Sequence, residues 1–502
     1  MEINIIVAFC KKCGIGKEGD IPWNIKKDML HFKNITTNSI VIMGRKTYYS
    51  IKECNRPLKN RYTIVLTHNP GEYNKKERNT ENVLFCDFKG FNDLYYYGNN
   101  NNTVYKSLRD TYNTMFVIGG QEIYSYFLDN YIIKNLYVTY IEAAFPCDRF
   151  FPQFLDSQFK LCSYSKKYTS ENNDISYRFL TYTNKSSSQS KINENNKNGE
   201  YVYLDLIQRI VRDGIHRKDR TGTGTVAIFG NQMRFDISES IPLLTTKFVS
   251  WRAIIEELLW FLRGDTNSKI LEEKSIHIWK GNTSREFLDT RGLSDYSEGD
   301  IGPMYGWIWR HCGAEYTGCN TDYNGFGIDQ IAEVIHMLKT DPYSRRIMMT
   351  TYDPRIKDKG CLIPCHGINL QFYVEDADDM ENYISDTKHK NKKMLSASML
   401  QRSSDSFLGL PLNIASYTVL VYIIAKLVDM VPKELVINTN DTHIYLDHID
   451  AVNTQLSREC YPFPKLVISD DILNIDIKDY KIEHFDLIGY IYHPLIKGKM
   501  SV

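Results

Sequence analysis

A short polar stretch divides this chain of 502 residues into two parts. Residues 184–199 (NKSSSQSKINENNKNG) contain a single apolar residue, Ile192, and are otherwise small and polar. Such a composition cannot bury enough apolar surface to fold by itself. We therefore expect a linker at 184–199 between two domains, residues 1–183 and 200–502, each long enough to form its own core.

The overall composition argues against several classes of protein. Lys+Arg and Asp+Glu both number 61, so the net charge is zero and gives no sign of nucleic acid or a membrane surface as the main partner. The 11 cysteines lack the paired spacing of a zinc site, so we expect free thiols and no metal. The chain begins like a strand rather than a signal peptide, and its longest apolar stretch, Tyr417–Ala425, is too short to span a bilayer. We expect a soluble cytoplasmic protein.

The first domain shows short apolar runs that alternate with helical patterns. The expected strands are Ile3–Phe9, Ile40–Met43, Thr63–Leu66, Met115–Ile118 and Leu136–Ile141. This alternation predicts an α/β domain with a mostly parallel central sheet and flanking helices. Gly14–Trp23 is expected to be a loop, and Gly119-Gly120 lies between a strand and the expected helix Gln121–Leu128. Backbone N–H groups at such a junction can bind a phosphate, although glycines are also common in ordinary turns.

Asp28 lies on the apolar stripe of an expected helix that begins near Asn24. Ile25 and Phe32 are one turn away on either side. The acid is either a paired structural carboxylate or an acid in an apolar cleft, where burial raises its pKa and lets it hold or relay a proton.

Seven segments occur in an order that resembles dihydrofolate reductase over essentially all of residues 1–183. They are Val7-Ala8, Gly14–Trp23, Asp28, Met43–Thr47, Arg56–Arg61, Ile118–Gly120 and Thr139. The resemblance implies that Asp28 binds the pteridine N–H groups and assists protonation at N5. It implies dihydrofolate contacts from Ala8, Asp28, Met29, Phe32, Ile51, Leu58, Arg61, Ile118 and Thr139, with Arg61 on the α-carboxylate. It implies NADPH contacts from Ala8, Ile15, Gly16, Trp23, Gly44, Arg45, Lys46, Thr47, Thr67, His68, Gly119, Gly120, Gln121, Glu122, Ile123 and Tyr124, with Arg45 on the 2′-phosphate.

The first domain also departs from this pattern. Tyr48 stands where the family usually has tryptophan, and Arg149 replaces a threonine. Residues 87–114 form a long asparagine-rich stretch whose conformation the sequence leaves open.

In the second domain, Cys365 lies in the segment Leu-Ile-Pro-Cys-His-Gly (362–367). A buried core cysteine is the ordinary interpretation of an isolated thiol. Downstream, Leu400–Asn413 (LQRSSDSFLGLPLN) spaces polar groups through an apolar stretch. Buried polar groups must find partners, and a bound polar ring that carries a phosphate would supply them.

Two further features of this domain allow more than one interpretation. Glu257 lies between Ile254 and Phe261 on the expected helix Trp251–Leu262 and is either a buried structural glutamate or an acid that manages protons. Arg345-Arg346 is expected to begin a strand, where adjacent side chains point to opposite faces. The pair is either a solvated basic surface or a set of ligands for a partner subunit's site.

Residues 200–502 resemble thymidylate synthase throughout, which implies an α+β domain. The resemblance implies that Cys365 adds to C6 of the uracil ring, that Glu257 and Tyr305 assist proton transfer, and that a field of arginines lowers the pKa of the thiol. It implies dUMP contacts from Arg220, Arg345, Arg346, His366, Gln401, Arg402, Ser403, Asp405, Asn413, His443 and Tyr445. It implies 5,10-methylenetetrahydrofolate contacts from Lys247, Ile278, Trp279, Asn282, Asp405, Leu408, Gly409, Leu412 and Val502. Arg345 and Arg346 would act in the partner's site of a homodimer.

The whole chain resembles the bifunctional dihydrofolate reductase–thymidylate synthases of protists and plants. Asn440, Leu412 and Tyr352 depart from the synthase pattern. The sequence does not determine the conformation of the insertion at 375–394. Two alternatives remain: a synthase with a non-catalytic reductase-like scaffold, and an additional role in RNA-binding regulation.

Overall fold

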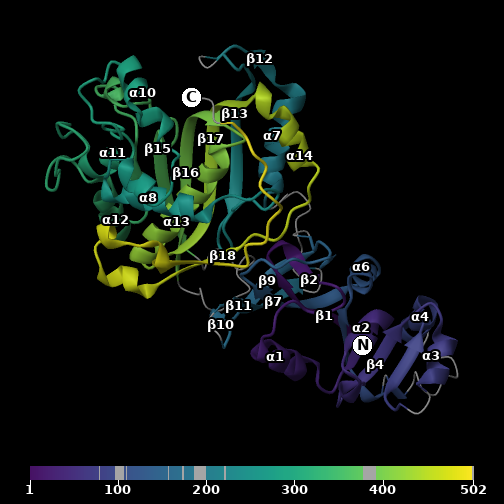
Figure 1. Cartoon of the computed structure of the whole chain (residues 1–502). Helices are drawn as coiled ribbons and strands as arrows, with labels where there is room; N and C mark the ends of the chain where they lie inside the picture. The colour runs from purple at the N-terminus through teal and green to yellow at the C-terminus, as the bar shows by residue number, and fades with distance from the viewer. Residues whose placement is uncertain are drawn as a thin grey trace. The chain divides into compact units, whose positions relative to one another are not determined.

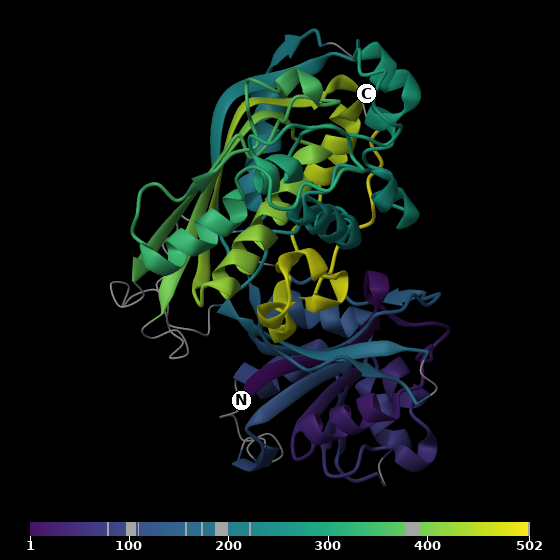
Figure 2. The ribbon, with the colours of Figure 1, turned by 90° about the vertical axis from the view of Figure 1, so that its left-hand side faces the viewer.

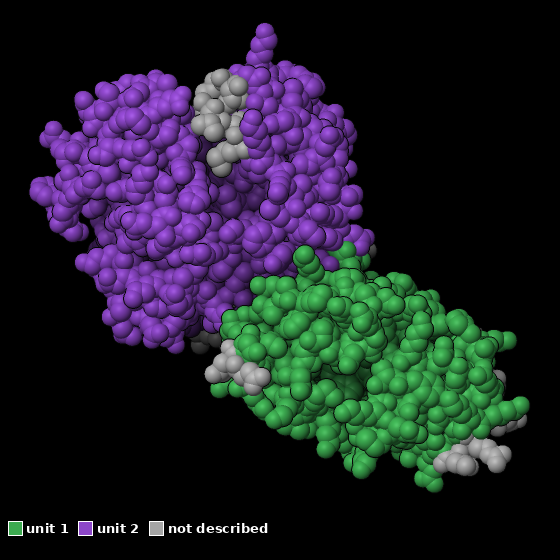
Figure 3. All heavy atoms as spheres, viewed as in Figure 1, with its two compact units in different colours: residues 1–192 green, residues 193–502 purple. Residues whose placement is uncertain are grey.

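The computed structural model of the chain describes residues 1–77, 80–96, 107–108, 110–155, 158–171, 174–185, 199–219, 222–376 and 392–499. The chain divides into two compact units, residues 1–192 and 193–502 (Figure 3). Most of the expected linker, residues 186–198, lies outside the described residues, as do most of the insertion at 375–394 and residues 97–106 and 109 of the stretch 87–114.

The amino-terminal unit is built on a nine-stranded sheet in the order β10-β11-β7-β1-β6-β3-β4-β5, with β9 also paired to β11 (Figure 1). The pairings β7-β1, β1-β6, β6-β3, β3-β4 and β4-β5 are parallel, and β9, β10 and β11 add an antiparallel edge. The prediction of a mostly parallel α/β domain is confirmed, and the strands in its parallel part read as continuous apolar runs because both faces are covered.

The strands of this unit are β1 (Glu2–Cys10), β2 (Gly14–Gly16), β3 (Ile40–Gly44), β4 (Tyr62–Leu66), β5 (Val83–Cys86), β6 (Thr114–Gly119), β7 (Ile133–Ile141), β8 (Arg149–Phe150), β9 (Phe159–Tyr164), β10 (Tyr168–Thr169) and β11 (Ser176–Asn184). The helices are α1 (Lys26–Thr36), α2 (Arg45–Ser50), α3 (Pro70–Lys76), α4 (Phe88–Tyr96) and α6 (Gln121–Asn130).

Two local predictions for this unit need correction. The segment expected as a loop at Gly14–Trp23 begins with the short strand β2, which pairs with β8. Helix α1 begins at Lys26 rather than near Asn24. Both differences arise at element ends, where hydrogen bonds to distant segments decide the boundary.

The carboxy-terminal unit contains a six-stranded mixed sheet in the order β12-β13-β17-β16-β15-β14. Only β16 and β17 run parallel, and the other neighbours are antiparallel. Helix α13 packs on β16 and β17, and α8 packs against α13. Figure 2 shows helices against the sheet in each unit. The α+β expectation is confirmed.

The strands of this unit are β12 (Ile215–Arg217), β13 (Thr225–Asp236), β14 (Met348–Met349), β15 (Asn369–Asp376), β16 (Lys393–Asp405), β17 (Val431–Tyr445), β18 (Lys465–Ile468) and β19 (Phe485–Ile488). The helices are α7 (Tyr201–Asp213), α8 (Trp251–Arg263), α9 (Lys269–Glu273), α10 (Arg285–Thr290), α11 (Gly306–His311), α12 (Gln330–Thr340), α13 (Gly409–Leu427) and α14 (Ile449–Leu456).

Helix α13 is longer than the apolar stretch that the sequence singled out. Its 19 residues have a mean hydropathy of 1.5, which satisfies the length and composition test for a membrane span, but 72% of the tested window is buried inside the unit. A helix that is apolar all round and surrounded by other elements is a core helix. Helix α13 therefore places most of its side chains in the interior. Its first turns carry Gly409, Leu412 and Asn413, which are among the expected ligand-binding residues.

Candidate active sites

The residues expected to bind NADPH gather at the carboxyl edge of the parallel strands. Gly44–Thr47 follow or end β3, Thr67 and His68 follow β4, and Gly119 ends β6. The loops after β3 and β6 are close together, because a Cβ built on Gly120 would lie 3.3 Å from Oγ1 of Thr47. Ligands of parallel α/β sheets bind at this edge.

Helix α6 begins directly at this edge. Its N-cap, Gly120, provides no side-chain cap, so N–H groups of the first turn remain available for an anion. Gly119 has a φ of 135°, which favours glycine. Gln121 and Glu122 are exposed here, whereas Ile123 and Tyr124 are buried, and the Tyr124 hydroxyl donates to the carbonyl of Ile6 at 3.0 Å.

Two cations flank the same edge. Arg45 begins α2 with its guanidinium 5.3 Å from the ring centre of Tyr73, and Lys46 is exposed. Within the described ranges neither side chain forms an ion pair with a carboxylate. Ile15 and Gly16 lie in or beside β2, and the indole Nε1 of Trp23 is buried without a hydrogen-bond partner among the described residues.

Asp28 lies in the first turn of α1 and accepts a hydrogen bond from the side chain of Thr139. Thr139 is buried on β7, where it pairs with Ala8 of β1 and with Phe179 of β11. Burial raises the pKa of Asp28 above its ordinary value, and the Thr139 hydrogen bond opposes that rise. The structure thus favours the acid-in-a-cleft interpretation, since no cation pairs with Asp28 in the part of the chain described.

The apolar residues expected near this acid lie in two hydrophobic clusters or on α1 itself. Ile51, Leu58 and Ile118 pack against one buried cluster, and Ala8 and Trp23 belong to another. Phe32 is half-buried on α1, and Met29 is 56% exposed beside Asp28. The structure therefore places the expected dihydrofolate residues on apolar surfaces of this unit, and a cleft that they share around Asp28 stays a prediction.

Arg61 is a buried cation at the border of that cleft, with an exposed fraction of 7%. Its Nη1 donates to Oγ1 of Thr36 at 2.9 Å, its Nε donates to the carbonyl of Lys59 at 3.1 Å, and its guanidinium lies 5.6 Å from the ring centre of Phe32. No described carboxylate neutralises it, and burial lowers its pKa. A buried guanidinium held this way is suited to a bound carboxylate.

Cys365 lies in a loop before β15 and contacts Tyr305, which precedes α11. The backbone N–H of Cys365 donates to the Tyr305 hydroxyl at 3.0 Å, and the hydroxyl lies 3.4 Å from Sγ. Tyr305 has a φ of 39°, a strained backbone for a residue other than glycine. Its neighbour Gly306 packs so closely on α8 that a Cβ would lie 2.3 Å from the carbonyl oxygen of Phe261. Close helix packing therefore holds the phenol against the thiol.

The expectation that a field of arginines lowers the pKa of Cys365 is tested here for Arg402 alone, whose charge does lower it. Burial raises the pKa of the thiol, and the Tyr305 hydrogen bond and the charge of Arg402 oppose it only in part. Desolvation penalises the thiolate more than one arginine at this distance favours it.

Glu257 lies on α8 and accepts a hydrogen bond from Nε1 of Trp279 at 2.8 Å. Burial raises its pKa to about 7. Glu257, on the apolar stripe of α8, is thus a carboxylate that can exchange its proton near neutral pH. Its hydrogen bond to Trp279 connects it to the segment expected to bind the folate.

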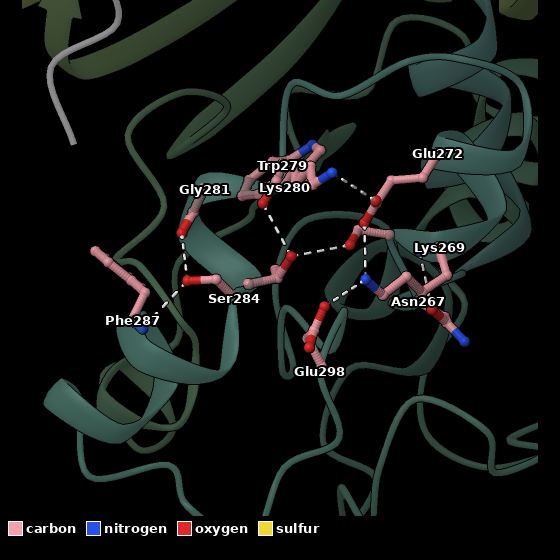
Figure 4. A network of polar contacts seen from close by, with 11 residues as sticks. Asn267, Lys269, Glu272, Trp279, Lys280, Gly281, Ser284, Phe287 and Glu298 are labelled. Atoms are coloured by element: carbon pink, nitrogen blue, oxygen red, sulfur yellow. Dashed lines mark hydrogen bonds and ion pairs between the residues drawn. The ribbon is translucent and has the colours of Figure 1, made fainter.

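The segment Ile278–Asn282 takes part in a network of polar contacts (Figure 4). Thr283 donates from Oγ1 to the carbonyl of Trp279 at 2.9 Å, and the Ser284 hydroxyl donates to the carbonyl of Gly281 at 3.2 Å. Lys280 lies 4.0 Å from Glu272. These contacts hold the backbone at Trp279 and Gly281, and the side chain of Trp279 is 9% exposed.

The four expected phosphate arginines have different surroundings. Arg402 donates from Nε to the carbonyl of Pro364 at 3.2 Å and from Nη2 to that of Ile363 at 3.0 Å, so it lies against the Cys365 loop. Arg345 and Arg346 are exposed and lie in a turn, since β14 begins only at Met348. The expectation that they begin a strand is wrong. Arg220 lies outside the described residues.

Polar groups of β16, β17 and α13 line the other side of the site. Gln401 is buried and accepts a hydrogen bond from Nδ2 of Asn413 at 3.2 Å, while Ser403 is half-buried. Asp405 accepts from the N–H groups of Phe407 and Leu408 at 3.0 and 3.1 Å, which fixes the turn into α13. His443 contacts Asp441 at 3.0 Å and meets the ring of Tyr445 edge-on.

The other residues expected to bind 5,10-methylenetetrahydrofolate have different surroundings. Leu408 and Leu412 pack against the core near Gly409, at the start of α13. Lys247 is 5% exposed and donates to the carbonyl of Phe407, so its ammonium lies in the interior, where burial lowers its pKa to about 7. Val502 lies outside the described residues.

The structure adds Tyr417, which the sequence argument had counted only as the start of an apolar stretch. Its hydroxyl lies 2.9 Å from Nδ1 of His366, and its side chain is buried. The available signal was its spacing, since Tyr417 follows Asn413 by four residues on one helix and shares its face.

Comparisons with known proteins match both units. The family described as dihydrofolate reductase matches residues 2–184, and the family described as thymidylate synthase matches residues 201–502. The bifunctional dihydrofolate reductase-thymidylate synthase of Paramecium tetraurelia is 39% identical, with 99% of this chain and 98% of that protein covered. Those of Zea mays and Leishmania major are 37% and 36% identical, with 99% of this chain and 96% and 95% of those proteins covered. The chain therefore belongs to the family of bifunctional dihydrofolate reductase–thymidylate synthases.

Proposed function

We propose that the residues assembled at the two sites carry the two activities of this family in this chain. The carboxy-terminal unit methylates dUMP with 5,10-methylenetetrahydrofolate and releases dTMP and dihydrofolate. The amino-terminal unit reduces that dihydrofolate with NADPH. The observation that carries the proposal is the set of groups in each unit. One unit holds a thiol in contact with a phenol and a glutamate whose pKa is about 7, and the other holds a desolvated acid and a buried arginine.

In the reductase site, the chain's own groups bind, orient and protonate. Arg61 binds the folate α-carboxylate, and Met29, Phe32, Ile51 and Leu58 contact the folate body. NADPH, when bound, supplies the hydride. The donor set fits it, because the start of α6 has no side-chain cap, and Arg45 and Lys46 form no ion pair with a described carboxylate, so both features suit phosphates. Asp28 keeps its proton more readily than a solvated acid because burial raises its pKa, and this proton serves N5 of the pterin.

In the synthase site, the Cys365 thiolate adds to C6 of the uracil ring and makes C5 nucleophilic. C5 takes the methylene carbon of the folate and then loses its proton. Elimination of the folate and transfer of its hydride yield dTMP and dihydrofolate, and the thiolate leaves C6. Glu257 manages protons through ordered water, and Tyr305, which contacts Sγ, assists removal of the C5 proton. Asn413 contacts the uracil edge, and His443 and Tyr445 contact the deoxyribose hydroxyl.

The homodimer forms through the exposed face of the six-stranded sheet. This face carries Tyr373, which is 63% exposed, together with Arg234, Ser396 and Ser398, and it borders Arg345 in one groove. An exposed sheet face of this kind can pack against the same face of a second copy of the chain. Arg345 and Arg346 would then reach the dUMP phosphate of the partner's site, where they and Arg220 would favour the Cys365 thiolate that burial disfavours in a single chain.

The functional boundaries that we propose are residues 1–183 and 200–502, with 184–199 as a tether and the cytoplasm as the compartment. Matches to both families give no support to a non-catalytic reductase scaffold. No observation on the described surface favours an RNA-binding role.

The test is a pair of substitutions in the full chain. Cys365→Ser is expected to abolish dTMP formation and leave NADPH-dependent dihydrofolate reduction, and Asp28→Asn is expected to do the reverse. Absorbance at 340 nm follows each reaction with its own substrates. Loss of both activities in either folded variant would contradict independent sites.

A further inference from the structure

We propose that Tyr417 is a positioning residue of the synthase site, because its hydroxyl donates to Nδ1 of His366 and leaves Nε2–H as the donor of that imidazole. The dUMP site then contains one histidine tautomer, and its orientation is set by a helix residue behind it.

The geometry around the pair is closely constrained. The Tyr417 hydroxyl and Nδ1 are 2.9 Å apart, and the two rings meet nearly edge-on, with centres 5.6 Å apart and planes at 84°. The next residue, Gly367, has a φ of 64°, and a Cβ there would lie 2.1 Å from the Tyr417 hydroxyl oxygen. The backbone therefore wraps closely around the phenol, and only glycine fits.

The direction of the hydrogen bond follows from the surroundings of each group. Tyr417 is 2% exposed, and among the described residues its hydroxyl contacts no other polar partner. If Nδ1–H donated to the phenol oxygen, the phenol O–H would be buried without an acceptor, at a cost of about 1–3 kcal/mol. Burial also lowers the pKa of His366 to about 3, so the imidazole is neutral and has a single N–H.

Tyr417 and His366 are linked to the expected nucleophile, Cys365, through contacts of Tyr305. The His366 ring stacks on the Tyr305 ring, with centres 4.3 Å apart and planes at 20°, and the Tyr305 hydroxyl lies 3.4 Å from Sγ of Cys365. Thr351 donates to the carbonyl of His366 at 2.7 Å and holds the backbone at the same point. No described residue accepts a hydrogen bond from Nε2, so this donor remains available to the pyrimidine or to its ordered water.

Helix α13 explains why a tyrosine occupies this position. Asn413 and Tyr417 are one turn apart on its first half, and Asn413 is engaged with Gln401 at 3.2 Å. One helix face thus presents the amide that contacts uracil and the phenol that orients His366, and residues at this spacing lie side by side.

The first test needs no substitution at Tyr417. Magic-angle-spinning NMR of microcrystals labelled with ¹⁵N-histidine reports which ring nitrogen carries the proton, and the His366→Gln variant identifies the His366 signals by their loss. We expect a protonated Nε2 and an unprotonated Nδ1. A proton on Nδ1 would overturn the proposal.

The second test compares Tyr417→Phe with Tyr422→Phe. Tyr422 is on the same helix, and its hydroxyl donates to the carbonyl of Ile237 at 2.6 Å, away from the site. Tyr417→Phe is expected to lower kcat for dTMP formation about tenfold, the kinetic equivalent of one hydrogen bond, while KM for dUMP stays within about twofold. In its spectrum both tautomers of His366 should appear. Tyr422→Phe should change neither kcat nor the His366 signals, and an equal fall in kcat in both variants would overturn the proposal.

A double-mutant cycle separates action through His366 from a general packing effect. If Tyr417 acts through the imidazole, Tyr417→Phe should cost little further activity in the His366→Gln background. The same fold-change in both backgrounds would contradict that route. Thermal unfolding of each variant shows whether the carboxy-terminal unit stays folded.

Discussion

The indole Nε1 of Trp279 donates a 2.8 Å hydrogen bond to Oε1 of Glu257. This bond lowers the pKa of the carboxyl, but burial outweighs it and holds the pKa at about 7. Glu257 can therefore gain and lose a proton near neutral pH, and the residue that modulates it lies in the segment expected to contact the folate. If the folate packs against Trp279 as proposed, its binding and proton exchange at Glu257 are coupled through this hydrogen bond.

The raised pKa of Glu257 should make the free energy of unfolding depend on pH. The folded chain keeps its proton up to about pH 7, whereas an ordinary glutamate loses it near 4.5. The bound proton of Glu257 contributes on the order of 3 kcal/mol to the free energy of unfolding. This contribution is fully present below about pH 4.5 and is lost as the pH rises to about 7. Urea unfolding of the wild type and Glu257→Gln from pH 4.5 to 8 measures it, and equal slopes would contradict it. Trp279→Phe should extend the decline to higher pH.

Arg345 and Arg346 should act across the dimer. We expect Cys365→Ser and the double variant Arg345→Ala/Arg346→Ala each to lack synthase activity. Mixed after reversible dissociation, they should recover about a quarter of the wild-type rate, because half of the dimers are mixed and each mixed dimer has one complete site. Arg402→Ala is the matched control, since Arg402 contacts the Cys365 loop of its own chain. Its mixture with Cys365→Ser should recover nothing.

Arg61 should determine folate affinity. Arg61→Lys is expected to raise KM for dihydrofolate about tenfold with kcat within about threefold, because an ammonium cannot bind a carboxylate through two parallel hydrogen bonds. Arg178→Lys is the control, as Arg178 is also buried but pairs with Glu142 at 3.3 Å. It should lower thermal stability and leave KM unchanged. Steady-state NADPH oxidation gives both constants, and an unchanged KM in Arg61→Lys would exclude the assigned role.

Gly367→Ala should impair the synthase beyond the strain of its backbone. Gly367 and Gly325 have φ values of 64° and 81°, but only at Gly367 would a Cβ collide with a neighbour, the Tyr417 hydroxyl at 2.1 Å. Each alanine costs roughly 1–2 kcal/mol from φ alone. We expect Gly325→Ala to keep full synthase activity and Gly367→Ala to lose most of it, with dihydrofolate reduction unchanged in both. Thermal unfolding and dTMP assays measure the two effects, and equal activities would refute the close fit.

The sequence predicted features that depend on local periodicity. Asp28 and Glu257 were recognised because a carboxylate on the apolar stripe of a helix must lie against the interior, and burial does raise the pKa of both. The parallel strands were predicted from continuous apolar runs, because a strand that is buried on both faces has few polar side chains. Strands β9 and β10 were not predicted, since they are short and half exposed and depend on β11 for their hydrogen bonds.

By itself, then, the sequence determined the fold classes of the two domains and the family, and it supplied the candidate groups of both proposed sites. Only the tertiary structure decided how those groups modify one another. It placed Arg345 and Arg346 in a turn, turned Lys247 into the interior, raised the pKa of Cys365, and joined Tyr417 to His366 across 51 residues of sequence. These outcomes depend on burial and on contacts between distant segments, and local periodicity carries no information about either.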